Sequence, residues 1–319
     1  MTILPADSQN VARAGDALRC GGVVAFPTET VYGLGALAFD RVAVARIFEI
    51  KGRPHFDPLI VHVLDRAMLS SVVSTMPRCA EQLVDRFWPG PLTLLLEKSA
   101  MVPELVTAGS SRVAVRMPSH PVARALLAAA GGPIAAPSAN PFGGLSPTRA
   151  EHVAEGLGDR VDLILDGGAT EHGLESTIVA LDPSPVLLRP GAIPAEAIEA
   201  VVGQLEREIG PGALAAPGRL GQHYAPRTPL RLIDPSTVPA AERRGAGWLA
   251  LRDEFDGYAA GRTLSREGDL RAAAAFFFQA LHELDSLGIE RIDAQPLPPT
   301  GLGLAMMDRL ARAAASRNA

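Results

Sequence analysis

Two cations, Lys51 and Arg53, stand one glycine apart directly before an apolar segment that is typical of a strand. Arg53 precedes a proline, which favours an extended backbone, and residues two apart in an extended chain point to the same side, roughly 6.6 Å apart. Gly52 between them lets an anion approach the backbone, and the spacing suits a polyphosphate better than a single carboxylate. A solvated helix end, where cations suit the helix dipole, is the alternative interpretation.

Four further polar residues stand within or at the ends of predicted strands. His62 lies inside an apolar segment, Arg116 ends another, and Ser176 and Arg189 mark the boundaries of two more. A histidine on an apolar face is most often a core residue, and an arginine at a strand end can clamp a carboxylate or form a structural ion pair. Both kinds of role stay open for these residues at this point.

A turn-rich segment after another short strand carries Ser138, Asn140 and Ser146. Thr148 and Glu151 then predict a helix start with a capping box, and Pro147 fits the first turn. Free backbone N–H groups at such a start attract phosphate. A plain turn and cap explain Ser146 and Thr148, but they explain Ser138 and Asn140 less well.

The elements that position these residues alternate between a helical period and a strand period. Asp40 is predicted as the N-cap of a helix that runs to about Ile50, where Gly52 and Pro54 end it. Other helices are predicted over 8–20, 78–87, 120–130 and 194–208, and strands over 21–27, 58–64, 91–97, 112–118, 133–138, 176–182 and 185–190. This order predicts a layered α/β unit with a mixed sheet.

A stretch rich in Pro, Gly and Ala over residues 209–229 fits neither period and predicts a linker. Strands over 230–234, 247–251 and 291–297 and helices over 268–286 and 302–315 predict a second, smaller α/β unit beyond it. We therefore predict domains over 1–208 and 230–319 that are joined by the linker.

Composition narrows the functional classes. Hydrophobic residues make up 47% of the chain and charged residues 20%, which is typical of a globular protein. The two cysteines, Cys20 and Cys79, indicate neither a disulfide framework nor a zinc site. The net charge of −5 argues against tight nucleic-acid binding, and without a signal segment or a membrane-spanning apolar run we expect a cytoplasmic protein.

Common nucleotide-binding and hydrolase motifs do not match the chain. There is no G-x-x-x-x-G-K-[ST], no G-x-S-x-G and no H-E-x-x-H. Residues 33–38 match the loose pattern G-x-G-x-x-A, but the segment PTETVY separates them from the preceding strand. Since a dinucleotide site needs the strand to turn directly into the glycines, this pattern argues against a dehydrogenase.

A set of longer strings resembles one family as a whole. In order, over about residues 10–200, they are FPTETVYGLG, KGRP, DPLIVHV, FWPGPLT, VAVRMP, PSAN, SPT, ESTIV and LLRPGAI. They are similar to the YrdC-like family of L-threonylcarbamoyladenylate synthases. HYAPRTPL and GLGLAMMDRLARAA resemble its longer, two-domain members, which extends the resemblance to nearly the whole chain.

This resemblance implies a fold, a reaction and a site. The fold would be a twisted mixed sheet with helices, the catalytic domain, plus a smaller Rossmann-like α/β domain. The reaction would join L-threonine, bicarbonate or CO₂, and ATP with Mg²⁺ into threonylcarbamoyl-AMP and pyrophosphate, for a separate tRNA threonylcarbamoyl transferase. Thr30, His62, Arg116, Ser138 and Ser176 would surround the threonine, while Lys51, Arg53, Asn140, Ser146, Arg189, His223 and Tyr224 would hold ATP. No side chain would act as a nucleophile.

Two departures and two alternatives accompany the resemblance. Asp57 stands where the family commonly has Asn, and a carboxylate there would repel ATP unless it points away or helps to hold metal. Ala216 and Gln222 replace residues that long members often carry in the linker, which puts linker contacts to phosphate in doubt. The alternatives are an RNA-binding module without catalysis, which the acidic balance disfavours, and a carbamoyl-transfer maturation protein, for which Cys pairs are expected.

Overall fold

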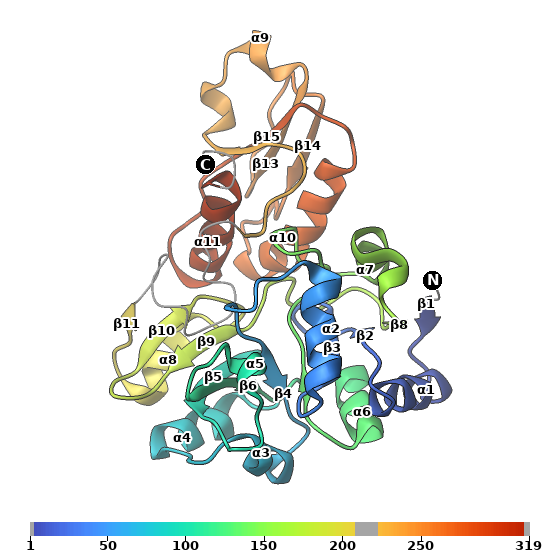
Figure 1. Cartoon of the computed structure of the whole chain (residues 1–319). Coiled ribbons are helices and arrows are strands. Elements are labelled where there is room, and N and C mark those ends of the chain that lie inside the picture. The colour runs from blue at the N-terminus through green and yellow to red at the C-terminus, as the bar shows by residue number, and fades with distance from the viewer. Residues whose placement is uncertain (1–2, 208–222, 316–319) are drawn as a thin grey trace.

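Two β-sheets organise residues 3–207 and 223–315, which are the residues that the computed structural model of the chain describes. Figure 1 shows the unit with the smaller sheet above the larger unit, and two helices, α10 (Leu270–Asp285) and α11 (Gly301–Ala315), at their junction. The predicted α/β class, with a mixed sheet and a second α/β unit, is confirmed.

The larger sheet is mixed and has eleven strands. From one edge to the other it runs through β1 (Ile3–Pro5), β8 (Leu163–Asp166), β2 (Val24–Phe26), β3 (Gly33–Leu37), β7 (Ile134–Ala135), β4 (Ile60–His62), β6 (Arg112–Arg116), β5 (Leu92–Glu97), β9 (Thr177–Ala180), β10 (Val186–Arg189) and β11 (Glu206–Arg207). The parallel pairing of β4 with β6 sets His62 directly opposite Arg116.

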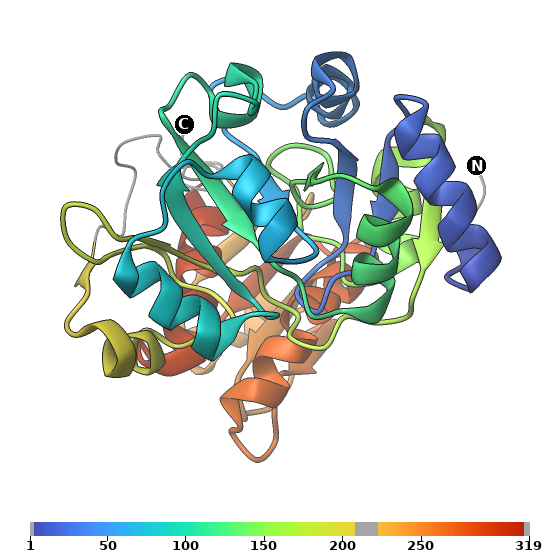
Figure 2. The same ribbon diagram turned by 90° about the horizontal axis from the view of Figure 1, so that it is seen from below.

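Helices cover both faces of this sheet. They are α1 (Ser8–Arg19), α2 (Arg41–Lys51), α3 (Arg66–Val72), α4 (Arg78–Phe87), α5 (Glu104–Thr107), α6 (Pro121–Ala130), α7 (Ala150–Leu157), the 3-10 turn η1 (Gly158–Arg160) and α8 (Ala195–Val202). Figure 2 shows α1 and α6 packed side by side near one edge of the sheet. Asp40 caps α2 as predicted, since its carboxylate accepts from the N–H groups of Val42 and Ala43.

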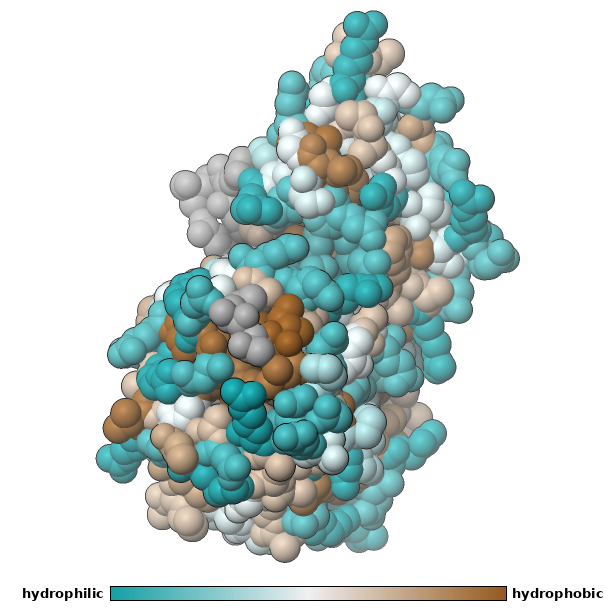
Figure 3. Space-filling model, turned by 90° about the vertical axis from the view of Figure 1, so that its right-hand side faces the viewer, coloured by the Kyte–Doolittle hydropathy of each residue, from teal (hydrophilic) through white to brown (hydrophobic). Residues whose placement is uncertain are grey.

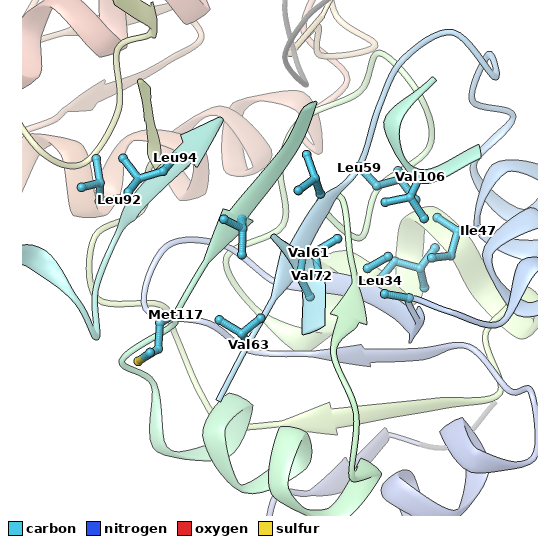
Figure 4. Packing of buried hydrophobic residues seen from close by; sticks show 14 of the residues in the cluster. Leu34, Ile47, Leu59, Val61, Val63, Val72, Leu92, Leu94, Val106 and Met117 are labelled. Carbon is cyan, nitrogen blue, oxygen red and sulfur yellow. The ribbon is translucent and has the colours of Figure 1, made fainter. Parts of the chain in front are cut away.

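The side-chain period of two explains why β2 is buried on both sides. Ala25 belongs to the large core beneath α2 to α5, while Val24 and Phe26 belong to the core beneath α1 and α6. Figure 4 shows the large core, to which β4 contributes Val61, β5 contributes Leu94 and α2 contributes Ile47. On β4, Val61 therefore faces this core, and His62 faces the other side, against the ring of Phe26.

The smaller sheet is parallel throughout. It comprises β12 (Leu230–Leu232), β15 (Arg291–Ala294), β13 (Ala246–Ala250) and β14 (Ala260–Thr263), with η2 (Pro235–Thr237) and α9 (Ala240–Arg243) between β12 and β13. Its core continues into the larger unit, because Val31, Leu145 and Tyr224 pack with apolar residues of α10 and α11.

Three local predictions are wrong. The helix predicted over 194–208 ends at Val202, because Gly203 takes a left-handed backbone with φ 83°. The capping box of Thr148 and Glu151 does not form, since α7 begins at Ala150 and no side chain caps it. The strands β1, β3, β8 and β14 were not predicted.

Most of the face drawn in Figure 3 is hydrophilic, with an apolar patch in its lower half. None of the helices within residues 3–207 and 223–315 has the length and apolar character that a membrane crossing needs. Part of the predicted linker, residues 209–222, lies outside the described residues, and so do Ala216 and Gln222.

Candidate active site

A cavity opens beside the carboxyl ends of β4 and β6 and reaches His223 and Tyr224, in the described part of the predicted linker. Nine of the twelve predicted site residues line it: Thr30, Arg53, His62, Arg116, Ser138, Ser176, Arg189, His223 and Tyr224. Lys51, Asn140 and Ser146 lie behind this lining and are buried. The fold therefore brings most of the predicted site residues together around one cavity.

Arg116 forms a buried ion pair that the sequence did not predict. Its Nη2 lies 2.6 Å from Oε1 of Glu29, and both side chains are at most 3% exposed. Its Nη1 donates to the hydroxyl of Thr30 at 2.9 Å, and Thr28 lies 2.8 Å from that hydroxyl. Burial raises the pKa of Glu29, but the charge and hydrogen bond of Arg116 outweigh this and hold the pKa below its ordinary value. The guanidinium is thus held in place.

His62 is a neutral imidazole in this site. Burial, and then the charge of Arg116, lower its pKa to about 3, and Nδ1 has no hydrogen-bond partner among the residues that the structure describes. Its ring lies in the cavity lining, so it offers an uncharged polar group beside Arg116 and the Glu29 carboxylate.

Replacing His62 by Gln should flatten the dependence of stability on pH. Between pH 6.5 and about 3, the folded protein keeps His62 neutral while the unfolded chain protonates it, so acid removes stability. The wild type should lose about 2 kcal/mol more unfolding free energy than His62→Gln between pH 7 and pH 5. Urea unfolding at both pH values measures this, and parallel pH profiles would contradict it.

Lys51 and Arg53 are both buried, so the solvated helix end is wrong. The predicted extended geometry is also wrong: Lys51 is the last residue of α2, and Gly52 ends that helix in the left-handed region at φ 63°. The ammonium of Lys51 donates to the carbonyls of Ser138, at 2.6 Å, and Asn140. Lys51 therefore ties the end of α2 to the loop after β7, and burial with the charge of Arg53 lowers its pKa well below the ordinary value.

Asp57 faces Arg53 rather than solvent. Its Oδ2 lies 2.8 Å from Nη2 of Arg53, and both side chains are at most 3% exposed. Arg53 also donates to the carbonyls of Asp57 and Pro58, at 3.0 and 2.8 Å. The Asp57 carboxylate thus occupies hydrogen-bonding groups of Arg53 to which an anionic ligand would otherwise bind.

If the cavity binds the ATP that the resemblance implies, replacing Asp57 by Asn should tighten this binding, because the change removes a negative charge beside Arg53 and keeps a polar side chain there. We expect the KM for ATP to fall by about 3–10-fold, since like charges this close oppose each other strongly in a buried site. Thermal stability should fall at the same time, because Arg53 loses its charged partner. A higher KM would instead indicate that the carboxylate supports ATP, for instance through a metal ion.

Arg189 and Ser176 meet on the other side of the cavity. Arg189 donates to the carbonyl of Ser176 from Nε and Nη2, at 3.2 and 2.8 Å, and to its hydroxyl at 3.1 Å. The Ser176 hydroxyl also lies 2.7 Å from that of Thr93 on β5. These bonds hold Arg189 in the cavity lining, together with Arg53 and Arg116.

Ser146 and Asn140 are held by their own surroundings. The Ser146 hydroxyl donates to Oε1 of Glu175 at 2.5 Å, and the Asn140 amide donates to the carbonyls of Pro141 and Gly144. Asn140 Oδ1 is buried without a hydrogen-bond partner.

His223 and Tyr224 cover one side of the cavity. Both are at most 5% exposed, and Tyr224 adopts a positive φ of 65°, a conformation that costs energy for a bulky residue. The next residue, Ala225, donates its N–H to the carbonyl of Gly143 at 2.8 Å. With these side chains in place the remaining cavity is only about 50 Å³, far below the 300–1,000 Å³ of typical ligand pockets.

The described residues do not build a metal cage. Within 3–207 and 223–315, His, Cys, Asp and Glu side chains nowhere form a group of three that could hold an ion. Glu29 and Asp57 are each paired with an arginine. We therefore derive no chemical step through a protein-bound metal.

Two models of known protein families match the chain. The family model of Sua5, YciO and YrdC, described as "Telomere recombination", matches residues 16–191. The chain belongs to this family. A second model, "Threonylcarbamoyl-AMP synthase, C-terminal domain", matches residues 193–315, so both units resemble parts of the long Sua5-type members.

Full-length relatives of this Sua5-type family agree. The threonylcarbamoyl-AMP synthase of Bacillus subtilis is 43% identical, with 98% of this chain and 95% of the relative covered. That of Pyrococcus abyssi is 42% identical, with 95% and 94% covered. The crystal structure of P. abyssi Sua5 complexed with L-threonine superimposes with a TM-score of 0.90 at 39% identity, over 98% of this chain and 96% of that one.

Sequence reasoning missed three charged residues of this Sua5-type site: Glu29, Glu175 and Arg309. Glu29 lies between two threonines in a buried stretch, and Glu175 directly precedes the predicted Ser176. An acidic residue inside an otherwise apolar segment is a usable signal, because such a carboxylate needs a cation. Arg309, on α11, has no local signal that links it to the larger unit.

Proposed function

We propose that the chain is a threonylcarbamoyl-AMP synthase, which converts L-threonine, bicarbonate or CO₂, and ATP into threonylcarbamoyl-AMP and pyrophosphate. The observation that carries this proposal is the meeting, in one cavity, of Arg116 with the pair Arg53 and Arg189. One end suits an amino-acid carboxylate and the other an extended phosphate. The names of the full-length relatives support the same reaction.

In this proposal the two substrates use different parts of the cavity. Arg116 would bind the carboxylate of threonine. The neutral imidazole of His62 would lie beside the amine without repelling it. The groups for threonine are Thr30, His62, Arg116, Ser138 and Ser176, and those for ATP are Lys51, Arg53, Asn140, Ser146, Arg189, His223 and Tyr224. The P. abyssi structure with L-threonine supports a threonine site in the fold.

The reaction depends on the positioning of the substrates and on neutralisation of the phosphate charge more than on a reactive side chain. The threonine amine forms a C–N bond with CO₂ and releases a proton to solvent, or with bicarbonate and releases water, and the product is a carbamate. A carbamate oxygen then attacks the α-phosphorus of ATP, the bond from that phosphorus to the oxygen shared with the β-phosphorus breaks, and pyrophosphate leaves. Fixed cations around the phosphates stabilise the charge that develops. Mg²⁺ would enter bound to the ATP phosphates and would offset part of their charge.

Closure of the site has a chemical purpose here. A carbamate and an acyl adenylate both react with water, so a site that excludes water protects them. His223 and Tyr224, near the end of the linker, already fill one side of the cavity. They would have to move for ATP to enter and could then pack over it. The product would pass to a separate tRNA threonylcarbamoyl transferase in the cytoplasm.

A reaction with all substrates tests the function. Purified protein is mixed with ATP, Mg²⁺, L-threonine and labelled bicarbonate, and pyrophosphate and the labelled adenylate are followed by phosphate assay and mass spectrometry. We expect pyrophosphate release only when threonine and bicarbonate are both present, and we expect Arg116→Met to abolish it. Release that does not depend on threonine or on bicarbonate would refute the proposal.

A further inference from the structure

The C-terminal unit contributes one fully buried cation to the neighbourhood of the cavity. The side chain of Arg309, on α11, is 0% exposed. Its Nε donates to Oε2 of Glu175 in the larger unit at 3.0 Å, and its Nη1 donates to Asp308 at 2.8 Å. A guanidinium is buried at high cost unless it is paired, so these contacts are what hold it there.

Glu175 connects this arginine to the residues of the site. Its Oε2 accepts from Arg309, while its Oε1 accepts from the hydroxyl of Ser146. Glu175 also lines the cavity. The guanidinium of Arg309 lies over the ring of Tyr224, 5.0 Å from its centre. One side chain of the C-terminal unit therefore fixes the partner of Ser146 and supports Tyr224.

Other contacts between the two units lie close to Glu175 and Ser146. Gly173, two residues before Glu175, has φ 62°, and a Cβ there would meet the carbonyl oxygen of Ala274 on α10 at 2.4 Å. His282 on α10 lies 3.1 Å from the carbonyl of Ser146 and stacks on His152, with ring centres 3.8 Å apart. The segments that carry Ser146 and Glu175 are thus both held by helices of the other unit.

Glu175 differs from Asp57 and Glu29 in where its ion-pair partner lies. Arg53 and Arg116 have their carboxylates, Asp57 and Glu29, within the larger unit. The ion pair of Glu175, by contrast, comes from the C-terminal unit. Without Arg309, Glu175 would lose this ion pair and keep only the charge of Arg189 nearby, and its carboxylate would line a cavity that has to accept phosphate, where like charges repel strongly.

We propose that Arg309 is a positioning residue for the nucleotide: by neutralising Glu175 and fixing Ser146 and Tyr224, it makes ATP binding depend on the docked C-terminal unit. This inference rests on the proposed function, because that function assigns Ser146 and Tyr224 to ATP. It gives the C-terminal unit a role at the site besides support of the fold.

Binding of ATP to four variants of the full chain tests the inference without any turnover. Calorimetry with ATP and Mg²⁺ should give a Kd about tenfold or more above wild type for Arg309→Gln, because a buried charge pair is broken. Adding Glu175→Gln in the same chain should return Kd to within about threefold of wild type, since the unpaired charge is then gone. Arg309→Lys should give a Kd between those of the wild type and Arg309→Gln, because it keeps the charge but lacks the planar guanidinium that contacts Glu175, Asp308 and the Tyr224 ring.

The matched control is Arg262→Gln, which removes the ion pair with Glu283 inside the C-terminal unit. Its Kd for ATP should equal that of the wild type, and the Kd for L-threonine should change less than twofold in every variant. If Arg309→Gln is insoluble, the double variant Arg309→Gln with Glu175→Gln decides the matter, and a tenfold loss of ATP affinity in that variant overturns the inference.

The remaining outcomes separate the inference from the function. If Arg309→Gln binds ATP like Arg262→Gln, or if Glu175→Gln restores nothing, the inference is wrong. A wild type that binds no ATP overturns both the inference and the proposed function. A wild type that binds ATP with the expected pattern across the variants, yet releases no threonine-dependent pyrophosphate, refutes the function and supports the inference.

Discussion

Replacing Glu29 by Met is expected to lower the free energy of unfolding by about 3–5 kcal/mol and to abolish measurable synthesis. Removal of one partner from a buried ion pair leaves the other charge uncompensated, which costs far more than the pair itself contributes. Arg116 would be that charge, because it is 3% exposed and Glu29 lies 2.6 Å away. Urea unfolding measures the stability, and pyrophosphate release measures the activity.

The double variant Glu29→Met with Arg116→Met separates stability from function. Buried pairs can often be replaced by apolar residues at little cost, so most of the lost stability should return. Threonine binding should not return, because Arg116 is the group assigned to its carboxylate. A Glu29→Met protein as stable as the wild type would show that something other than Glu29 neutralises Arg116.

Local patterns predicted most of the elements because those elements follow local rules. The helix over 78–87 has the bounds of α4, and the Asp40 cap formed as expected. The strand β3 was missed because its sequence, GLGAL, has few strand-forming residues. Its glycine at position 35 is explained only by packing: a Cβ there would meet Ile134 at 2.6 Å and Phe26 at 2.7 Å.

The arginines of the predicted site were identified from the sequence, but the ion pairs of Arg116 with Glu29 and of Arg309 with Glu175 were not. Strand ends and short strings marked Arg53, Arg116 and Arg189, and the cavity brings these together. The partner of Arg116 lies 87 residues earlier in the chain, and Arg309 lies 134 residues from Glu175. Such pairs arise from tertiary contact, so no periodicity or spacing in one sequence reveals them.

Lys51 makes contacts that the sequence did not predict. The sequence predicted that the Lys51 ammonium binds phosphate. In the structure it donates to the carbonyls of Ser138 and Asn140. The backbone repeats the connection, since Phe142 donates its N–H to the carbonyl of Lys51 at 2.8 Å. Lys51 therefore shapes the loop that carries one residue assigned to threonine and one assigned to ATP.

Replacing Lys51 by Met should lower kcat/KM about 100-fold or more for both substrates, because hydrogen bonds from a charged donor contribute about 1.5–3 kcal/mol each and two are lost. Their buried carbonyls are left unsatisfied, so the loop should shift. Steady-state kinetics with each substrate varied in turn measures the effect. Lys98→Met is the matched control, since Lys98 is the other lysine of the chain and donates to the carbonyl of Val102.

The pattern across the two substrates distinguishes the possible roles of Lys51. A lysine that only binds phosphate would raise the KM for ATP and leave threonine binding as it is. A lysine that only ties the loop would weaken both, because Ser138 and Asn140 move together when their carbonyls lose the same donor. Equal losses, with a wild-type-like Lys98→Met, would therefore assign Lys51 to the loop. A loss of kcat/KM confined to ATP would instead assign Lys51 to binding of the triphosphate. The ammonium would then have to leave these carbonyls when the nucleotide binds.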